Sequence, residues 1–217
     1  MKISEINFRD VDHKWIGIEN KKNCKKIAKK LKNKELIAPI FGYFYIDEDY
    51  GITLKVVGNI EVDGHKKLYI NALFLDEDYI IDYDFMNKIK LEFEILDDID
   101  ISSNIEGAHI IENKLQYKNI NNILETRSNN VLDKFRDDKY PDDIEVELEH
   151  KEDEIVEHLW VTIEGIMDTR PDLMICKLNN SSEYDDSFKE GEYVAVKYYE
   201  DDDAVRIYGH LKKRTEE

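Results

Sequence analysis

His158 is the residue best placed by its neighbours to perform acid–base chemistry. It belongs to the segment EHLWVTIEG at residues 157–165, whose pattern predicts a strand with His158, Trp160 and Thr162 on one face. Beside a carboxylate, such a histidine would act as the general base of a divergent hydrolase. In the competing interpretation this face is the covered second face of a sheet, and we expect that arrangement.

A second candidate for chemistry is the string P-D…E-x-K, which is typical of metal-dependent nucleases. It is formed by Pro141-Asp142 and Glu149-His150-Lys151. The two carboxylates must share one metal ion, but most of the residues between them have the pattern of a strand. At a rise of about 3.3 Å per residue the carboxylates would lie roughly 20 Å apart, so we reject a nuclease site.

Acidic residues gather in short clusters, at residues 47–49, 76–78, 97–98, 152–154, 185–186 and 200–203. A calcium loop of the EF-hand type is excluded at the first cluster, because Gly51 follows Asp47-x-Asp49 one position too early. We expect solvated turns, since Asp stabilises turns through local hydrogen bonds, and no bound metal. The residues that we expect to contact a partner are Glu200, Asp201, Asp202, Asp203 and Trp160.

Common catalytic and cofactor motifs are absent from the chain. The sequence contains no G-x-G-x-x-G, G-x-x-x-x-G-K-[ST], G-x-S-x-G, H-E-x-x-H or C-x-x-C string. The six histidines are never three or four residues apart, which is the spacing typical of metal ligands on a helix. We therefore expect no cofactor, and the motifs disfavour an enzyme.

The formal net charge is −18, yet residues 20–35 hold eight lysines and one acid. This segment predicts an amphipathic helix, capped by Asn20 or Asn23, with Cys24, Ile27, Ala28 and Leu31 as its apolar stripe. The simplest interpretation of the lysines is a solvated helix surface, and an acidic partner or a second copy of the chain is the alternative. Nucleic acid is disfavoured, because the whole-protein charge repels phosphates beyond a Debye length of about 8–10 Å.

Composition indicates a folded, cytoplasmic, bacterial protein. Hydrophobic residues make up 41% of the 217, and the charged N-terminal residues do not resemble a secretory signal. The longest uncharged apolar stretch, residues 36–46, is shorter than the roughly 20 residues of a membrane span. Cys24 and Cys176 are expected to be buried, reduced thiols.

Periodicity predicts an α+β fold of two small modules, each an antiparallel sheet with a packed helix. Residues 1–117 form the first module, in which the basic helix precedes a meander of strands over residues 41–95. Asp63-Gly64 is expected as a hairpin turn, Gly58 as a bulge or close approach, and residues 88–95 as a half-buried strand.

Residues 118–217 form the second module, which opens with a helical region over residues 118–137. Ser128-Asn129-Asn130 is expected to interrupt it, and its apolar face is expected to hold Ile120, Ile123, Leu124, Val131, Leu132 and Phe135. Five strands follow, predicted at residues 144–149, 155–163, 173–178, 192–199 and 204–208.

The second module resembles a small family of bacterial domains of unknown function, the YegJ-like group, over about residues 130–210. The similarity is carried by EHLWVTIEG, by MICKLNN at residues 174–180 and by KEGEYVAVKYY at residues 189–199. The Asp-Trp pair usual after the last strand of that family is replaced here by residues 204–209. The resemblance implies a fold and no catalytic residues.

We therefore expect a non-enzymatic binding protein whose acidic surface engages a basic partner. Immunity-type neutralisation of a cationic nuclease is a concrete instance, because an acidic surface steers onto a basic one. A hydrolase using His158 with a carboxylate and a structural scaffold module remain the alternatives.

Overall fold

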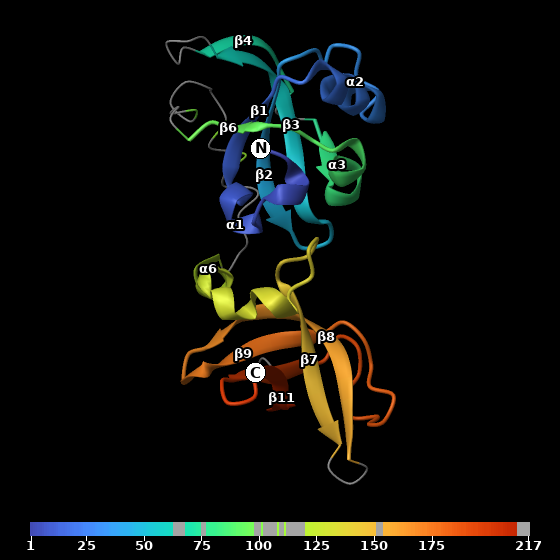
Figure 1. Ribbon diagram of the computed structural model, residues 1–217, viewed down its shortest axis with the longest axis vertical. Coiled ribbons are helices and arrows are strands. Elements are labelled where there is room, and N and C mark those ends of the chain that lie inside the picture. Colours follow the sequence, from blue (N-terminus) through green and yellow to red (C-terminus); the bar gives the residue numbers. More distant parts are fainter. Residues whose placement is uncertain are drawn as a thin grey trace, which may run out of the picture. The chain divides into compact units, whose positions relative to one another are not determined.

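The computed structural model describes residues 1–62, 68–74, 77–97, 101, 108, 111, 120–150 and 154–211 (Figure 1). The chain divides into two compact units, Met1–Gln116 (unit 1) and Tyr117–Glu217 (unit 2). Both units combine helices with antiparallel strand pairs, which confirms the α+β class. Within the described residues, no helix is both long enough and apolar enough to cross a membrane.

Unit 1 is built on an antiparallel sheet with the strand order β4-β3-β2-β1-β6, and β5 pairs with β3. The central strand β2 is buried at every position except its last, so both faces of the sheet are covered. One face packs mainly aliphatic residues, with Phe44 and Phe93 among them, and we call it the aliphatic face. The other packs the aromatic residues Trp15, Phe41, Tyr43 and Tyr45. The strands are β1 (Lys14–Ile18), β2 (Ile40–Asp47), β3 (Gly51–Val62), β4 (Leu68–Leu73), β5 (Ile80–Asp82) and β6 (Glu94–Ile95).

Two helices, α2 (Lys21–Lys30) and α3 (Tyr83–Ile89), pack on the aliphatic face and lie on the same side of the sheet in Figure 1. Asn20 is the N-cap of α2, as predicted, and its Oδ1 accepts hydrogen bonds from the backbone N–H groups of Lys22 and Asn23. Cys24 and Ile27 are buried on the predicted stripe. The shorter elements of this unit are η1 (Ile3–Glu5) and α1 (Phe8–Val11).

The half-buried strand predicted over residues 88–95 is wrong. Helix α3 extends to Ile89, Lys90 adopts a left-handed conformation with φ 53°, and only β6 pairs as a strand. Leu91 and Phe93 are nevertheless buried in the same core as Ile89. The alternation of apolar and charged residues therefore predicted correctly which side chains are buried. It did not predict the backbone, which is a helix end followed by an extended segment.

Unit 2 begins with α6 (Ile120–Ser128) and the 3-10 helix η2 (Asn130–Phe135), so the interruption predicted at residues 128–130 is confirmed. Leu124 and Val131 are each 43% exposed, however, which contradicts their place on the predicted apolar face. Ile123 and Leu132 of the same predicted face are buried, and so are Thr126 and Arg127. The region therefore consists of two short helical elements with separate contacts, and its apolar residues do not form one continuous face.

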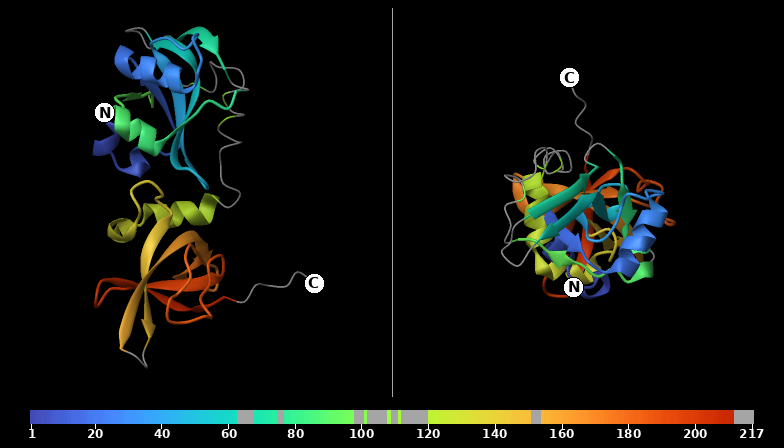
Figure 2. Two further views of the ribbon diagram at one scale, coloured as in Figure 1. Left: turned by 90° about the vertical axis from the view of Figure 1, so that its right-hand side faces the viewer. Right: turned by 90° about the horizontal axis from the view of Figure 1, so that it is seen from above.

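The strands of unit 2 form a closed barrel in which each strand pairs with the next and β11 returns to pair with β7 (Figure 1). Because the number of strands is odd, this closing pair is parallel. Helix α6 contacts β8 and lies across one end of the strands (Figure 2). The strands are β7 (Asp143–His150), β8 (Ile155–Met167), β9 (Arg170–Leu178), β10 (Tyr193–Tyr199) and β11 (Ala204–His210), which contain the five predicted segments apart from residue 192.

The two cysteines are buried and unpaired, as predicted, Cys24 in unit 1 and Cys176 in unit 2. Burial raises the pKa of both thiols, so neither is an activated nucleophile. The predicted turn at Asp63-Gly64 lies outside the described residues, as do His65 and His109.

Gly58 makes the predicted close approach to a neighbouring strand. A Cβ atom at this position would lie 2.2 Å from the carbonyl oxygen of Ala72 in β4, a distance that forces the strands apart. A Cβ atom at Gly17, in β1, would meet Leu96 side-chain atoms at 3.9 Å, which is ordinary contact. The two glycines therefore form a matched pair within one sheet.

We predict that Gly58→Ala lowers the free energy of unfolding of unit 1 by about 1–3 kcal/mol, as expected for overpacking. Gly17→Ala should change it by less than about 0.5 kcal/mol. Urea denaturation followed by the fluorescence of Trp15, in a Trp160→Phe background, measures both variants. Equal stability of the two variants would contradict the close approach.

Candidate functional site

The most distinctive surface of unit 2 is a row of carboxylates along β7. Its buried positions hold apolar side chains that face the barrel interior, and every residue between them that faces outward is an acid. Strand alternation accounts for this arrangement, since successive side chains point to opposite faces. We call this row the acid ladder: Asp143, Glu145, Glu147 and Glu149.

Strand β8 lies beside the acid ladder and contributes Trp160 and His158 to the same outer surface. Trp160 pairs with Glu145 across the two strands, and His158 pairs with Glu147. Trp160 is 36% exposed, which leaves a large aromatic surface next to the carboxylates. The structure therefore places two residues singled out in the sequence on one acidic face.

Arg206 of β11 closes the other side of the ladder. Its Nε lies 2.8 Å from Oε2 of Glu147 and 3.0 Å from Oε1 of Glu149, and its Nη1 contacts Asp202. The hydrogen bonds to Asp202 and Glu147 raise the pKa of Arg206. One guanidinium thus links the ladder to the acidic turn between β10 and β11.

That turn holds the remaining predicted partner contacts, Glu200, Asp201, Asp202 and Asp203, all of which are exposed. Asp202 binds Arg206, and Asp203 binds Nζ of Lys134 and the hydroxyl of Tyr198. The hydrogen bond from Lys134, followed by that from Tyr198, lowers the pKa of Asp203. Glu200 and Asp201 make no ion pair within the described residues, so they contribute net negative charge beside the ladder.

His158 does not lie on a covered face, and that expectation is wrong. Its side chain is 56% exposed, because the second face of β8 is the outer surface of a barrel, which leaves it open to water. Its Nδ1 lies 3.7 Å from Oε2 of Glu145, longer than the roughly 2.6–3.2 Å of a working proton-transfer contact. The geometry therefore gives little support to a hydrolase that uses His158.

A serine and a histidine also meet at a cavity of about 590 Å³ near the end of β11. Oγ of Ser187 lies 3.3 Å from Nε2 of His210, but the hydroxyl donates its hydrogen to Oδ1 of Asp185 at 2.6 Å. A nucleophilic serine must donate that hydrogen to the histidine. The hydrogen bonds from Ser187 lower the pKa of Asp185, so this group orders a loop and does not form a catalytic pair.

Asp142 of the rejected nuclease string is also explained by the structure. Its carboxylate receives hydrogen bonds from Nε and Nη2 of Arg127 at 2.9 and 2.6 Å, and both side chains are almost fully buried. Among the residues that the structure describes, no group of three or more His, Cys, Asp or Glu side chains is placed to hold a metal ion. Asp142 is thus part of a structural ion pair.

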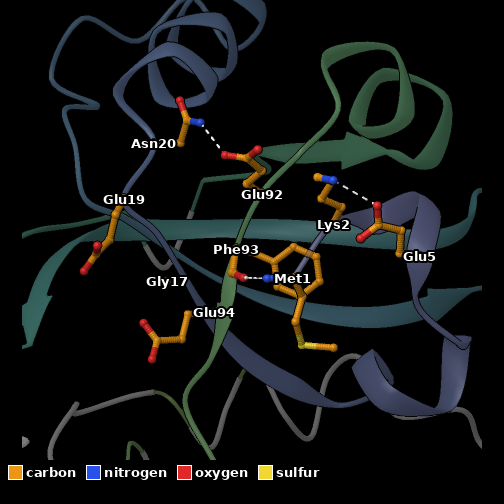
Figure 3. Close-up of a pocket in the computed structure, with 9 residues that line it drawn as sticks. All are labelled: Met1, Lys2, Glu5, Gly17, Glu19, Asn20, Glu92, Phe93 and Glu94. Carbon is orange, nitrogen blue, oxygen red and sulfur yellow. Dashed lines mark hydrogen bonds and ion pairs between the residues drawn. The ribbon is translucent and has the colours of Figure 1, made fainter.

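Unit 1 carries a separate acid-rich cavity of about 430 Å³, drawn in Figure 3. Glu92 accepts a hydrogen bond from Asn20, and Glu5 pairs with Lys2. Glu19 and Glu94 line the same cavity and make no ion pair with any described residue (Figure 3). Negative charge therefore faces solvent on both units.

No protein-family model matches the chain, and neither a curated protein nor a solved structure matches it significantly. The resemblance to the YegJ-like group over residues 130–210 stays a prediction. The functional interpretation consequently depends on the residues themselves.

Glu157 of β8 pairs with Leu148 of β7 and anchors the loop between β9 and β10 to β8. Its carboxylate accepts hydrogen bonds from Oγ of Ser182 and N of Glu183, and Nε2 of His150 lies 3.1 Å away. Burial alone would raise the pKa of Glu157, but these three hydrogen bonds outweigh it and lower the pKa. The charged form is therefore the one that holds the loop.

We predict that Glu157→Gln destabilises unit 2 at neutral pH and that the deficit shrinks as the pH falls. Because the folded-state pKa is lowered, the stabilisation is complete above the unfolded pKa of about 4.3 and is lost below it. Urea denaturation at pH 7 and pH 3, followed by circular dichroism, measures the difference from wild type. Glu183→Gln is the control, and a deficit independent of pH would refute the role of the charge.

Proposed function

We propose that the chain is a non-enzymatic binding protein whose acidic face on the unit 2 barrel engages a basic partner. The observation that supports this proposal best is the acid ladder of β7 with the exposed Trp160 beside it. The carboxylates of the acid ladder would attract a basic partner, and the ring of Trp160 would add apolar contact area to the interface. Binding hot spots are enriched in tryptophan for this reason.

The charge of unit 2 favours a cationic partner. Residues 117–217 contain 14 Lys and Arg against 27 Asp and Glu, a formal net charge of −13. Such an excess attracts a basic surface and raises the rate of association, with an effect that weakens as salt increases. The surface thus explains a binding role without any catalytic group.

Neutralisation of a cationic nuclease is the specific instance that we favour. A nuclease must present positive charge to its phosphate substrate, and carboxylates two residues apart on β7 stand about 6.6–6.8 Å from each other. A row of negative charges at that spacing can occupy the same surface as a nucleic-acid strand. The basic partner is therefore expected to lose access to its substrate when bound.

A labelled decalysine peptide tests the acidic face directly. At low salt we expect Glu145→Gln/Trp160→Ala to bind it about fivefold or more weakly than wild type, as for loss of an aromatic anchor. The matched control is Glu48→Gln/Tyr50→Ala, which removes one exposed acid and one exposed aromatic ring from the β2–β3 turn of unit 1. Fluorescence anisotropy measures all three proteins.

Two results would contradict the proposal. An equal loss in both variants would mean that the peptide responds to net charge and not to this face. Binding that does not weaken between about 0.05 and 0.3 M salt would exclude an electrostatic interface.

A further inference from the structure

The exposed side of α2 carries lysines that have no acidic partner in the part of the chain that the structure describes. Lys21, Lys22, Lys25, Lys26 and Lys29 line a shallow groove of about 500 Å³, and we call this surface the lysine face. None of the five makes an ion pair with a described residue, although the chain contains 49 acids. Lys30, one position further on, pairs with Asp82 and lies over the ring of Phe85.

The N-terminal part of the lysine face is unfavourable for the helix that carries it. Lys21 and Lys22 stand in the first turn of α2, which holds no acid, so their charges oppose the positive end of the helix dipole. Lys21, Lys25 and Lys29 are also four residues apart, where like charges repel. Lys29 stands in the last turn, where the dipole favours a cation, so helix stability fails to account for Lys21 and Lys22 in particular.

The residues of the lysine face limit the kinds of partner that can bind there. The apolar residues of α2, Cys24 and Ile27, are buried in the core, so they cannot enter a membrane. The groove is lined by lysines and by no arginine or aromatic residue, which would read or stack on bases. The lysine face is thus a row of evenly spaced positive charges, and the partner that fits it best carries evenly spaced negative charges.

The acid ladder of the same chain has a matching spacing. Lysines one turn apart on α2 are separated by about 6 Å along the helix. Outward carboxylates on β7 are separated by about 6.6–6.8 Å. Over three positions the two spacings differ little, so Lys21, Lys25 and Lys29 could face Glu145, Glu147 and Glu149 of another copy.

We propose that the lysine face of one copy docks on the acid ladder of a second copy. This inference rests on the proposed function, because it concerns the same acidic face. A second copy of the chain would bind there in competition with the basic partner. Self-association then masks the ladder until a partner with higher affinity displaces the lysine face. A two-fold pair would use the contact twice, whereas repeated one-way docking would extend further.

Ionic strength sets the conditions in which this contact forms. Two copies of net charge −18 repel each other at long range. At about 0.1 M salt the Debye length is about 10 Å, which screens that repulsion while ion pairs at contact distance survive. At about 1 M salt the contact pairs are screened as well.

The experiment is sedimentation velocity at about 0.1 M salt with protein up to about 300 µM, a range that reveals weak association. Wild type should exceed the monomer mass of 25.7 kDa and return to it in high salt. Two charge-reversal variants, Lys21→Glu/Lys25→Glu/Lys29→Glu and Glu145→Lys/Glu149→Lys, should each stay monomeric. Their equimolar mixture should associate again, because the intact lysine face of the second variant can dock on the intact acid ladder of the first.

The control is Lys34→Glu/Lys88→Glu/Lys177→Glu, which makes the same charge change at exposed lysines elsewhere and should associate like wild type. If Glu149→Lys disturbs the contact with Arg206, Glu145→Lys alone replaces the second variant. Circular dichroism checks the fold of each protein. A monomeric wild type, or a mixture that stays monomeric, would overturn the inference.

Binding of a labelled DNA duplex is the last measurement of this experiment. Binding that requires the lysine face, with wild type still monomeric, would assign the face to nucleic-acid phosphates and overturn the inference. Decalysine binding by a monomeric wild type would leave the proposed function intact while this inference fails. Association of the mixture without decalysine binding would instead keep the inference and remove the proposed partner class.

Discussion

The unit 2 barrel closes where Arg206 of β11 pairs with Glu147 of β7. An odd number of strands in up-and-down order brings the first and last strands together in parallel, so no hairpin turn joins them. The described pairing between β11 and β7 is the register of Arg206 with Glu147, and the side chains of the same two residues form an ion pair. Backbone pairing and charge pairing therefore coincide at one point of the barrel.

The contacts of Arg206 also reduce the electrostatic repulsion within the acid ladder. Carboxylates at alternate positions of one strand repel each other, and the guanidinium reduces that repulsion by contacting Glu147 and Glu149. It does not remove it, since Asp202 also contacts Arg206 and Glu145 has no lysine or arginine partner among the described residues. The residue that closes the barrel thus leaves an excess of negative charge on its outer face.

Local patterns in the sequence predicted the elements that depend on local physics. The stripe and cap of α2, the break after Ser128 and the strands of unit 2 follow from side-chain period and turn chemistry, and the structure contains them. Helix α3 was missed although Asp82 signals its start, with Oδ1 accepting a hydrogen bond from N of Phe85. The alternating apolar residues after Met86 outweighed that signal, because burial with a period of two occurs without a strand.

The candidate site was only partly accessible to sequence reasoning. The alternation of acids and apolar residues from Asp143 to Glu149 is visible in the sequence and predicts an outward row of carboxylates once the strand is assigned. The role of Arg206 is not visible, because it depends on the pairing of β11 with a strand more than fifty residues earlier. The exposure of His158 follows from barrel closure for the same reason.

Cations that contact a carboxylate occur in both units, and they differ from the lysine face. Lys14, Lys30 and Lys55 of unit 1 make such contacts, as do Lys134, Lys197 and Arg206 of unit 2. On α2 the folding requirement ends with Cys24 and Ile27, and any helix-forming residue would satisfy the outer positions. Lysine stands at five of those positions, and two of them, Lys21 and Lys22, lie in a first turn that disfavours a positive charge, so the run reflects a constraint outside the folding of unit 1. A surface of opposite charge and similar spacing, such as the acid ladder, provides that constraint.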